Sequence, residues 1–227
     1  MSLLMKAHRT GRDIVEVTPR SAGWRYVGFS AHRLARDESM TVSRPGSELC
    51  IVVLGGTVTV SQGDQRWPEI GERGDVFDDR APYALYLPEG SAVAVQAHTK
   101  AEIGIASAPG PGSVGSRLIE PSRMKRFARG SGLNERFVCD ILPQTDPARH
   151  LLVVEVRTPS GHSSSYPPHK HDTDNLPEES SLEETYYHRL KPSQGFAFQR
   201  VYTDDRSLDE SLAVEDHDVV MVPRGYH

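Results

Sequence analysis

Short β-prone segments recur along the whole chain at intervals of about ten residues, and each ends in glycine, proline or another turn-forming residue. Residues 48–54 (ELCIVVL) form a continuous apolar run that ends at two glycines, whereas residues 57–60 (TVTV) alternate strictly. No segment keeps a 3.6-residue apolar period over three helical turns. This pattern predicts an all-β sandwich or barrel. The predicted strands span residues 25–34, 48–54, 57–60, 74–77, 84–88, 92–97, 101–106, 136–142, 151–157, 184–190, 195–203 and 212–222.

The clearest break in composition is the stretch of proline, glycine and serine at residues 109–116 (PGPGSVGS). Such a stretch is typical of a linker or crossover, and the second half of the chain repeats the strand pattern of the first. A chain of 227 residues is long enough for one large or two small domains. We therefore predict two β-barrels, at residues 1–112 and 113–227. Residues 1–3 (MSL), which precede a second methionine at position 5, are interpreted as a leftover of expression and are excluded.

Composition excludes several classes of protein. The net charge is −5 and no run of five basic residues occurs, so the electrostatic signature of a nucleic-acid-binding protein is missing. The sequence has no stretch of eighteen apolar residues and no apolar signal segment near its start, so the cytoplasm is the expected location. Cys50 and Cys139 each lie in an apolar stretch, which favours buried free thiols over a disulfide.

Residues 167–172 (PPHKHD) are the most chemically specific stretch. Side chains two apart in a strand point to the same face, so His169 and His171 are predicted to share a face. Glu184 on an antiparallel neighbour would complete a set of three ligands, and imidazoles with one carboxylate suit zinc, manganese or ferrous iron. A His-x-His pair alone is more often a pair of ordinary strand or surface histidines. The Pro-x-Gly turn that ends in His227 strengthens the prediction of a metal site.

These stretches resemble the two signature motifs of the cupin superfamily of small β-barrels. More narrowly, residues 164–172 (SSYPPHKHD), 183–187 (EETYY) and 222–227 (VPRGYH) resemble the bicupin deoxyglucuronate isomerases of myo-inositol catabolism. The resemblance implies two cupin-type barrels (double-stranded β-helices, or jelly rolls) and one divalent metal ion per chain, zinc or manganese before iron. It also implies a carbohydrate isomerase that converts 5-deoxy-D-glucuronate to 2-deoxy-5-keto-D-gluconate. The implied metal ligands are His169, His171, Glu184 and His227.

The first half resembles a cupin barrel that has lost its metal. Glu48 and Gly55 keep the cupin spacing of six intervening residues, but no His-x-His pair precedes Glu48. This carboxylate is therefore predicted to be structural or on the surface rather than a ligand. In the second half, an acidic insert of twelve residues separates His171 from Glu184, and it is predicted to be a functional or mobile loop over the barrel mouth. The insert leaves a choice of ligand between Glu183 and Glu184, and the spacing to the following strand favours Glu184.

The implied reaction moves a proton between adjacent carbons, so it needs a Lewis acid, a base and a clamp for the substrate carboxylate. Glu183 and Tyr187 are predicted to carry the proton, although core packing is an equally open role for Tyr187. Arg224 is the preferred clamp, because a guanidinium binds a carboxylate through two parallel hydrogen bonds. Lys170 is the alternative, but in a regular strand it would point away from the flanking histidines.

Other functions fit the same ligands. The related deoxyhexosulose-uronate isomerase of pectin breakdown is the nearest alternative, followed by a metal-dependent dioxygenase and a non-catalytic sugar-binding bicupin. The second barrel is expected to lack a closing strand, which would leave the site open, His227 poorly placed and the ion weakly held or absent. An unpaired edge strand would favour a homodimer that covers it. The expected partners are thus a small anionic sugar and a second copy of the chain.

Overall fold

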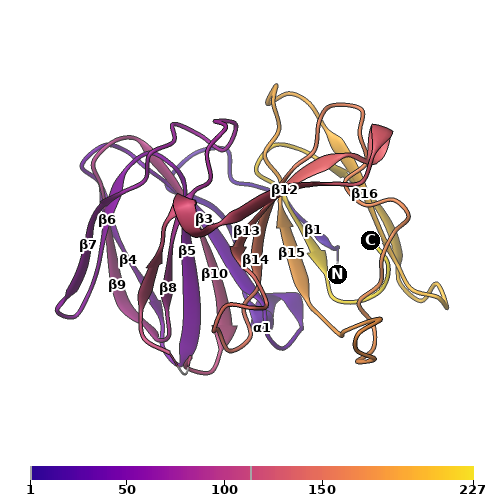
Figure 1. Cartoon of the computed structure of the whole chain (residues 1–227), viewed down its shortest axis with the longest axis horizontal. Helices are drawn as coiled ribbons and strands as arrows, with labels where there is room; N and C mark the ends of the chain where they lie inside the picture. The colour runs from indigo at the N-terminus through magenta and orange to yellow at the C-terminus, as the bar shows by residue number, and fades with distance from the viewer. Residues whose placement is uncertain (1, 113) are drawn as a thin grey trace.

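The computed structural model describes residues 2–112 and 114–227, which fold almost entirely into β-structure (Figure 1). The helices of this part are short: α1 (Pro19–Ala22), η1 (Pro121–Arg123) and η2 (Gly132–Asn134). None of the helices in the described residues is long and apolar enough to cross a membrane. The all-β prediction is confirmed. The strands are β1 (Leu4–Met5), β2 (Asp13–Val17), β3 (Gly28–Leu34), β4 (Ser39–Arg44), β5 (Ser47–Gly55), β6 (Val58–Gln62), β7 (Gln65–Ile70), β8 (Tyr83–Leu87), β9 (Gly90–Ala97), β10 (Ala101–Pro109), β11 (Arg117–Ile119), β12 (Lys125–Arg129), β13 (Arg136–Leu142), β14 (Val153–Arg157), β15 (Glu184–Tyr187), β16 (Ala197–Tyr202), β17 (Asp209–Val214) and β18 (Val219–Val222).

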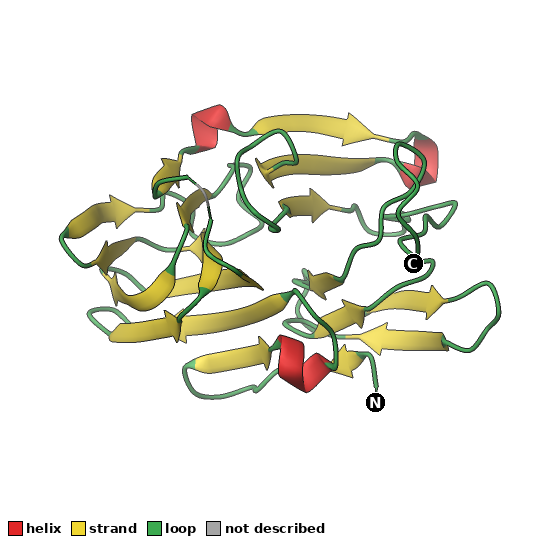
Figure 2. Cartoon of the chain, turned by 90° about the horizontal axis from the view of Figure 1, so that it is seen from below, coloured by secondary structure: helices red, strands yellow, loops and turns green. Residues whose placement is uncertain are grey.

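The first half is a sandwich of two antiparallel sheets. One sheet has the order β11-β8-β5-β10-β3-β2, and the other has the order β4-β9-β6-β7. Figure 2 shows the short helices at the periphery, outside the layers of strands. Because side chains alternate along a strand, each strand gives every second residue to the apolar core between the sheets. That core includes Leu49, Ile51, Val53, Val60, Leu85, Val93, Val95 and Ile103.

Strand β5 explains why residues 48–54 form one continuous apolar run. Its odd-numbered residues face the core of the sandwich, and its even-numbered residues face the other side of the sheet. On that second side, Cys50 and Val52 belong to an apolar cluster with Cys139 and Leu142 of β13. A strand buried on both faces needs apolar residues at every position. The run therefore marks the strand that lies between the two halves, and both cysteines are free and buried as predicted.

The second half is open along one side. Its sheets have the orders β12-β13-β14, β1-β18-β15 and β16-β17. In the first half β10 pairs with both β3 and β5, but within residues 114–227 no strand lies between β14 and β15. Val154 of β14 is accordingly 56% exposed. This agrees with the expectation that the second barrel lacks a closing strand.

Strands are exchanged across the predicted domain boundary. β1 pairs with β18 of the second half, and β11 pairs with β8 of the first half. In Figure 1 the indigo N-terminus accordingly lies among the orange and yellow strands. Leu3 is buried, and its carbonyl accepts a 2.8 Å hydrogen bond from the Met221 N–H. Excluding Leu3 from the fold was therefore wrong, whereas Met1 lies outside the described residues. The division at residues 112 and 113 stays a prediction.

Two predicted strands differ from the structure because turns interrupt them. Residues 74–77 form a turn, in which the side chains of Asp75 and Asp78 accept the N–H groups of Phe77 and Gly74. Residues 212–222 form two strands, β17 and β18, separated by a turn. His217 in that turn has φ 72°, a left-handed conformation that no strand contains.

Glu48 joins the two halves. Its side chain is 0% exposed and accepts the Tyr86 hydroxyl at 2.6 Å. It also accepts the backbone N–H groups of Arg149, His150 and Leu151 at 2.8, 2.5 and 3.0 Å. Glu48 is an even-numbered residue of β5, so its side chain points away from the sandwich core and toward the second half. The prediction of a structural carboxylate is therefore confirmed.

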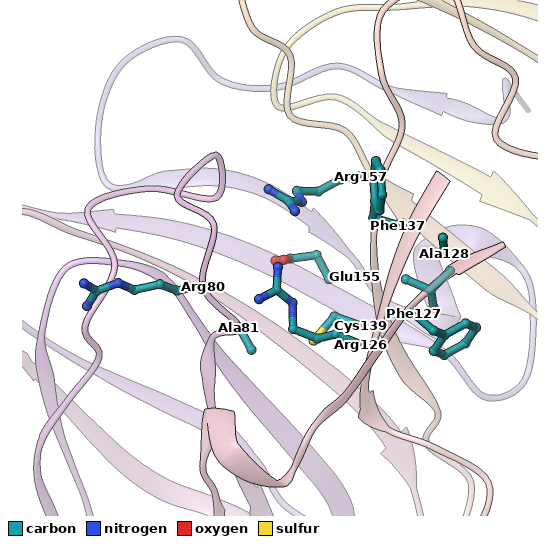
Figure 3. Close-up of a pocket in the computed structure, with 10 residues that line it drawn as sticks. Arg80, Ala81, Arg126, Phe127, Ala128, Phe137, Cys139, Glu155 and Arg157 are labelled. Carbon is teal, nitrogen blue, oxygen red and sulfur yellow. The ribbon is translucent and has the colours of Figure 1, made fainter. Parts of the chain in front are cut away.

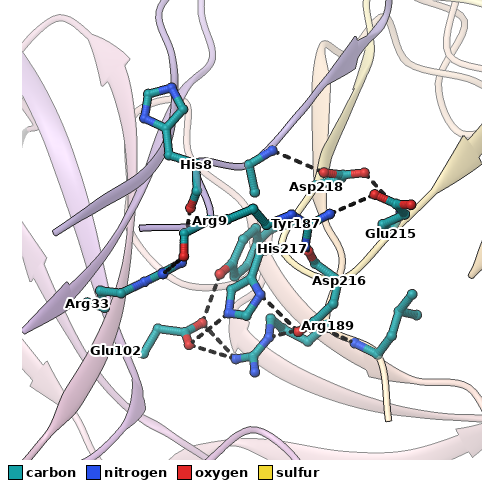
Figure 4. Close-up of polar contacts among 12 residues, drawn as sticks. His8, Arg9, Arg33, Glu102, Tyr187, Arg189, Glu215, Asp216, His217 and Asp218 are labelled. Atoms are coloured by element: carbon teal, nitrogen blue, oxygen red, sulfur yellow. Dashed lines mark hydrogen bonds and ion pairs between the residues drawn. The ribbon is translucent and has the colours of Figure 1, made fainter. Parts of the chain in front are cut away.

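A second polar cluster links the halves around Glu102 of β10 (Figure 4). Its carboxylate accepts the Tyr187 hydroxyl at 2.9 Å and the Arg189 guanidinium at 2.8 Å, and His217 Nε2 lies 3.4 Å away. The other ring nitrogen of His217 lies 2.9 Å from Asp216. Burial favours the neutral imidazole, but the hydrogen bonds to Asp216 and Glu102 outweigh it and raise the pKa of His217 above its ordinary value.

This cluster predicts a pH-dependent contribution to stability. A group whose pKa is raised in the folded state contributes fully below its unfolded pKa, and the contribution is lost as pH rises through the folded pKa. We expect His217→Gln to lower the free energy of unfolding more at about pH 5.5 than at about pH 9. Urea unfolding of both proteins at the two pH values measures the difference, and His98→Gln, outside the cluster, is the control. An equal loss at both pH values would contradict the assignment.

Candidate metal centre

The His-x-His segment and the C-terminal segment lie side by side. Lys170 and Tyr226 form an antiparallel bridge, the His171 N–H donates to the Gly225 carbonyl, and the His227 N–H donates to the His169 carbonyl. Residues 167–171 are not a regular strand, but alternation still puts His169 and His171 on one side, with ring centroids 4.8 Å apart. The same pairing brings the His227 ring within 4.3 Å of the His169 ring, centroid to centroid.

Strand β15 supplies the carboxylate. It pairs with β18, and Glu184 and Tyr186, two residues apart, point to the same face. One Glu184 oxygen lies 3.0 Å from His227 Nε2, and the other lies 3.6 Å from His171 Nε2. The Tyr186 hydroxyl donates to Glu184 at 2.7 Å and lies 2.8 Å from His227 Nε2.

The donor set fits a divalent metal ion. One ligand atom from each of His169, His171, Glu184 and His227 lies within 4.8 Å of the others. His171 Nδ1 is 3.2 Å from the Ser180 carbonyl, which only accepts, so this nitrogen carries the proton and Nε2 presents its lone pair to the cluster. Backbone carbonyls that fix a ligand tautomer in this way are typical of metal-binding histidines.

The charges also suit a cation. Burial, and then the nearby imidazoles of His227 and His171, lower the pKa of His169 to about 4, so its ring is neutral at physiological pH. Burial is the largest single influence and acts to raise the pKa of Glu184, but the hydrogen bond and charge of His227, with the Tyr186 hydroxyl and His171, together outweigh it and hold this pKa below its ordinary value. Metal binding requires neutral imidazole and ionised carboxylate. The cluster therefore holds these two ligands in the required protonation states.

His227 is not poorly placed, as the open barrel led us to expect. Its side chain is 2% exposed, because the backbone pairing with His169 and the contact with Tyr186 hold it inside. That expectation is corrected. The structure brings all four predicted ligands together, although no strand within residues 114–227 joins the edges of β14 and β15.

The two predicted proton carriers lie elsewhere, and both predictions are corrected. Glu183 and Tyr187 have the opposite parity to Glu184 and therefore point to the other side of β15. The Glu183 carboxylate accepts three backbone N–H groups of the first half, those of residues 25–27. The Tyr187 hydroxyl donates to Glu102 in the polar cluster between the halves.

The two candidate clamps make their polar contacts outside the four clustered side chains. Lys170 points away from its flanking histidines, as predicted, and contacts Asp204 at 3.0 Å. The Arg224 side chain is 52% exposed, donates to the Ser207 hydroxyl at 3.2 Å and lies 4.0 Å from Asp172. Arg224 is thus free of any short ion pair within the described part of the chain, and its role as a clamp stays a prediction.

Sequence reasoning missed three contacts of the cluster. Tyr186 was not predicted to lie in the site, although its parity with Glu184 was the available signal. Ser165 contacts His169 Nδ1 at 2.9 Å and donates to the His227 carbonyl at 3.3 Å. Ser180, near the end of the insert, holds His171. No sequence signal indicated the two serines, because both contacts depend on how the loops fold back.

A separate pocket of about 240 Å³ lies where the loop before β8 meets β12, β13 and β14 (Figure 3). Arg126 and Arg157 on its wall both bind Asp79, and the buried Arg73 binds Glu155 through two hydrogen bonds of 3.0 and 2.7 Å. None of the four clustered ligands lines this pocket. It belongs to the contact between the halves rather than to the metal centre.

An antiparallel β-fold that converges three imidazoles and one carboxylate on one point defines a cupin-type protein with a cluster that could hold a metal ion. The family comparison is more specific. The KduI/IolB family model matches residues 3–227, and the chain belongs to this family.

Similar proteins support this membership. The chain is 49% identical over 227 residues to the 5-deoxy-glucuronate isomerase of Geobacillus kaustophilus (strain HTA426), covering 99% of this chain and 82% of that relative. It is 46% identical to the 5-deoxy-glucuronate isomerase of Bacillus subtilis (strain 168), covering 93% and 79%. The crystal structure of an IolB-like protein from Salmonella typhimurium LT2 superposes with a TM-score of 0.96 at 45% identity, covering 100% of this chain and 86% of that one. A mutant of Bacillus subtilis oxalate decarboxylase, with a TM-score of 0.61 at 13% identity and coverage of 98% and 71%, shares the fold alone.

Proposed function

We propose that this chain is a 5-deoxy-glucuronate isomerase, which converts 5-deoxy-D-glucuronate to 2-deoxy-5-keto-D-gluconate in myo-inositol catabolism. The convergence of His169, His171, Glu184 and His227 carries the proposal. Relatives 46 to 49% identical over most of their length bear the name of this isomerase. The enzyme class is an intramolecular oxidoreductase, because an aldose becomes a ketose without a net change in composition.

The reaction removes a proton from the carbon beside the aldehyde and returns one to the aldehyde carbon. A divalent metal ion held by the four ligands would supply Lewis acidity, which lowers the energy of the negative charge that develops on the two substrate oxygens. Zinc or manganese is the ion we expect from three imidazoles and one carboxylate. Elemental analysis of the purified protein distinguishes the two.

The protein's own groups prepare this site. Burial, and then the charge of Glu184, raise the pKa of Tyr186, so its hydroxyl stays protonated and acts as a donor. It donates to Glu184 and thereby orients the carboxylate toward the histidines. Ser165 and Ser180 hold His169 and His171 through their Nδ1 atoms, which leaves Nε2 of both rings for the cluster. The donors are thus oriented before any ion binds, which reduces the reorganisation that binding requires.

We further propose that residues 1–112 form a metal-free barrel and that residues 113–227 form the metal-binding one. Glu48 is the motif carboxylate of the first half, and its oxygens accept backbone N–H groups of residues 149–151. These hydrogen bonds support the proposal that the first half binds no metal. Within the described residues, the edges of β14 and β15 pair with no further strand, which supports a homodimer whose mass in solution can be measured. Two free buried cysteines fit the cytoplasm.

Arg224→Ala is expected to weaken substrate binding without destabilising the fold. Loss of a bidentate contact with the substrate carboxylate costs roughly 1.5 to 3 kcal/mol, so the Michaelis constant should rise about 10- to 150-fold. The thermal midpoint should stay the same because this side chain is half exposed. Arg36→Ala, an exposed arginine of the first half, is the control. A lower midpoint with an unchanged Michaelis constant would remove Arg224 from the proposed site.

Turnover of 5-deoxy-D-glucuronate by the purified protein, before and after chelation, tests the proposed function. We expect ketose formation that chelation abolishes and that added zinc or manganese restores. Faster turnover of a 4-deoxy-hexosulose uronate would instead assign the chain to pectin breakdown. Oxygen uptake with ferrous iron would indicate a dioxygenase, and no turnover with the metal fully loaded would indicate a binding protein.

A further inference from the structure

Glu183 binds the backbone of the first half. One carboxylate oxygen accepts the Arg25 N–H at 2.6 Å, and the other accepts the Tyr26 and Val27 N–H groups at 2.7 and 3.0 Å. These three N–H groups are consecutive in the loop that leads into β3, and successive N–H groups form a natural seat for an anion. The contact spans 157 residues of sequence and joins the insert of the second half to the first half.

The first half makes the reciprocal contact. Glu48 accepts the three consecutive N–H groups of residues 149–151, in the loop that leads into β14. Both carboxylates lie at or just before the start of the strand that carries the cupin-like motif, and both point away from the interior of their own half. In the direction of its side chain, Glu48 therefore corresponds to Glu183 and not to the proposed ligand Glu184. Each half anchors one loop of the other through a single carboxylate.

The two anchors differ in what lies beside them. Glu48 stands in a half without the cluster, whereas Glu183 directly precedes the ligand Glu184. Because neighbouring side chains in an extended chain point to opposite faces, an anchored Glu183 fixes Glu184 toward the histidines. Glu183 also ends the insert of residues 172–183, whose Ser180 carbonyl holds the ligand His171. One anchor thus limits the motion of two of the four ligands.

We propose that Glu183 is a positioning residue, through which the backbone of residues 25–27 in the first half holds Glu184 and His171 of the metal centre in place. The inference rests on the proposed function only in taking this cluster as the metal-binding, catalytic centre. It gives the metal-free half a role in the chemistry of the other half. It also predicts reciprocity: if the anchor supports the bound metal, then the metal must stabilise the anchor by the same free energy.

The test compares Glu183→Gln with the wild type. An amide accepts through one oxygen only, so at least one N–H of residues 25–27 loses its acceptor while the size of the side chain is kept. We expect the zinc dissociation constant, measured by competition with a chelator, to rise about 10- to 100-fold, as when groups that orient metal ligands are removed. The turnover number should fall by a similar factor with little change in the Michaelis constant. Glu178→Gln, an exposed carboxylate of the same insert, is the matched control.

Amide hydrogen exchange gives a second readout that does not depend on activity. In the wild type, zinc should slow the exchange of the amides of residues 25–27, and in Glu183→Ala they should exchange rapidly with or without zinc. Rapid exchange in the variant with unchanged zinc affinity and turnover would overturn the proposal and leave Glu183 a purely structural anchor. If the wild type fails to isomerise 5-deoxy-D-glucuronate but Glu183→Gln still weakens zinc, the proposed function fails and the positioning role stands.

Discussion

Replacing His169 and His171 together by alanine is expected to abolish metal binding and to reduce isomerase activity more than about a hundredfold. Loss of groups that merely orient metal ligands costs about 10- to 100-fold, and this double variant loses two of the ligands themselves. Glu184 and His227 alone offer one carboxylate and one imidazole, which hold a divalent ion weakly against water. Metal content by elemental analysis and initial rates on 5-deoxy-D-glucuronate measure the two effects.

His162→Ala is the matched control for this double variant. His162 lies in the same segment as the two ligands, but its ring contacts the Glu135 carbonyl at 2.9 Å and is outside the cluster. It should keep its metal and its rate. Zinc should also raise the thermal midpoint of the wild type and of this control but not that of the double variant, because only a site in the folded state couples binding to stability. Equal metal content in the double variant and the wild type would refute the ligand set.

Glu48→Gln is expected to cause a large loss of stability with little change at the metal centre. In the wild type the carboxylate accepts three backbone N–H groups and the Tyr86 hydroxyl, all away from water. The glutamine amide accepts through one oxygen only, and its NH₂ group would face N–H donors. Each buried donor left without an acceptor costs about 1 to 3 kcal/mol, so we expect a loss of roughly 3 to 5 kcal/mol. The thermal midpoint should fall by about 10 °C.

Urea unfolding and thermal denaturation measure this loss, with Glu120→Gln, which changes an exposed carboxylate, as the control. Zinc affinity should stay near the wild-type value at temperatures where the variant is folded, because Glu48 touches no group of the cluster. A loss below about 1 kcal/mol, the usual size for a single surface contact, would mean that the loop at residues 149–151 finds other acceptors. A loss of metal with unchanged stability would mean that Glu48 belongs to the site after all.

The clustering of the four proposed ligands was predictable because it depends on local alternation and on a short turn. Side chains two residues apart in an extended segment point to the same face. This holds for His169 and His171, although their segment is not a regular strand. The same rule applied to Glu184 identifies Tyr186 as its neighbour in the cluster and excludes Glu183 and Tyr187. The error in the predicted proton carriers arose because they were chosen for being close in sequence to Glu184. The face of the strand to which each side chain points was given too little weight.

The partners of the buried carboxylates were not predictable. Glu48 accepts N–H groups about a hundred residues away, and Glu183 accepts N–H groups of a loop in the other half. Backbone N–H groups are the same at every residue, so a sequence carries no mark of which loop presents three of them together. The insert was predicted to be a loop over the mouth of the barrel, but which side of it faces the site depended on these contacts.

The sequence by itself determined the all-β class, most of the strands of the apolar core and the clustering of the four proposed ligands. These follow from side-chain alternation and from turn residues, which act over a few positions and leave a visible pattern. Only the tertiary structure decided that β1 pairs with β18, that Glu102 gathers Tyr187, Arg189 and His217, and that each half anchors a loop of the other. Such contacts join segments far apart in the chain, and their free energy depends on the exclusion of water and on geometry that exists only once both halves have folded.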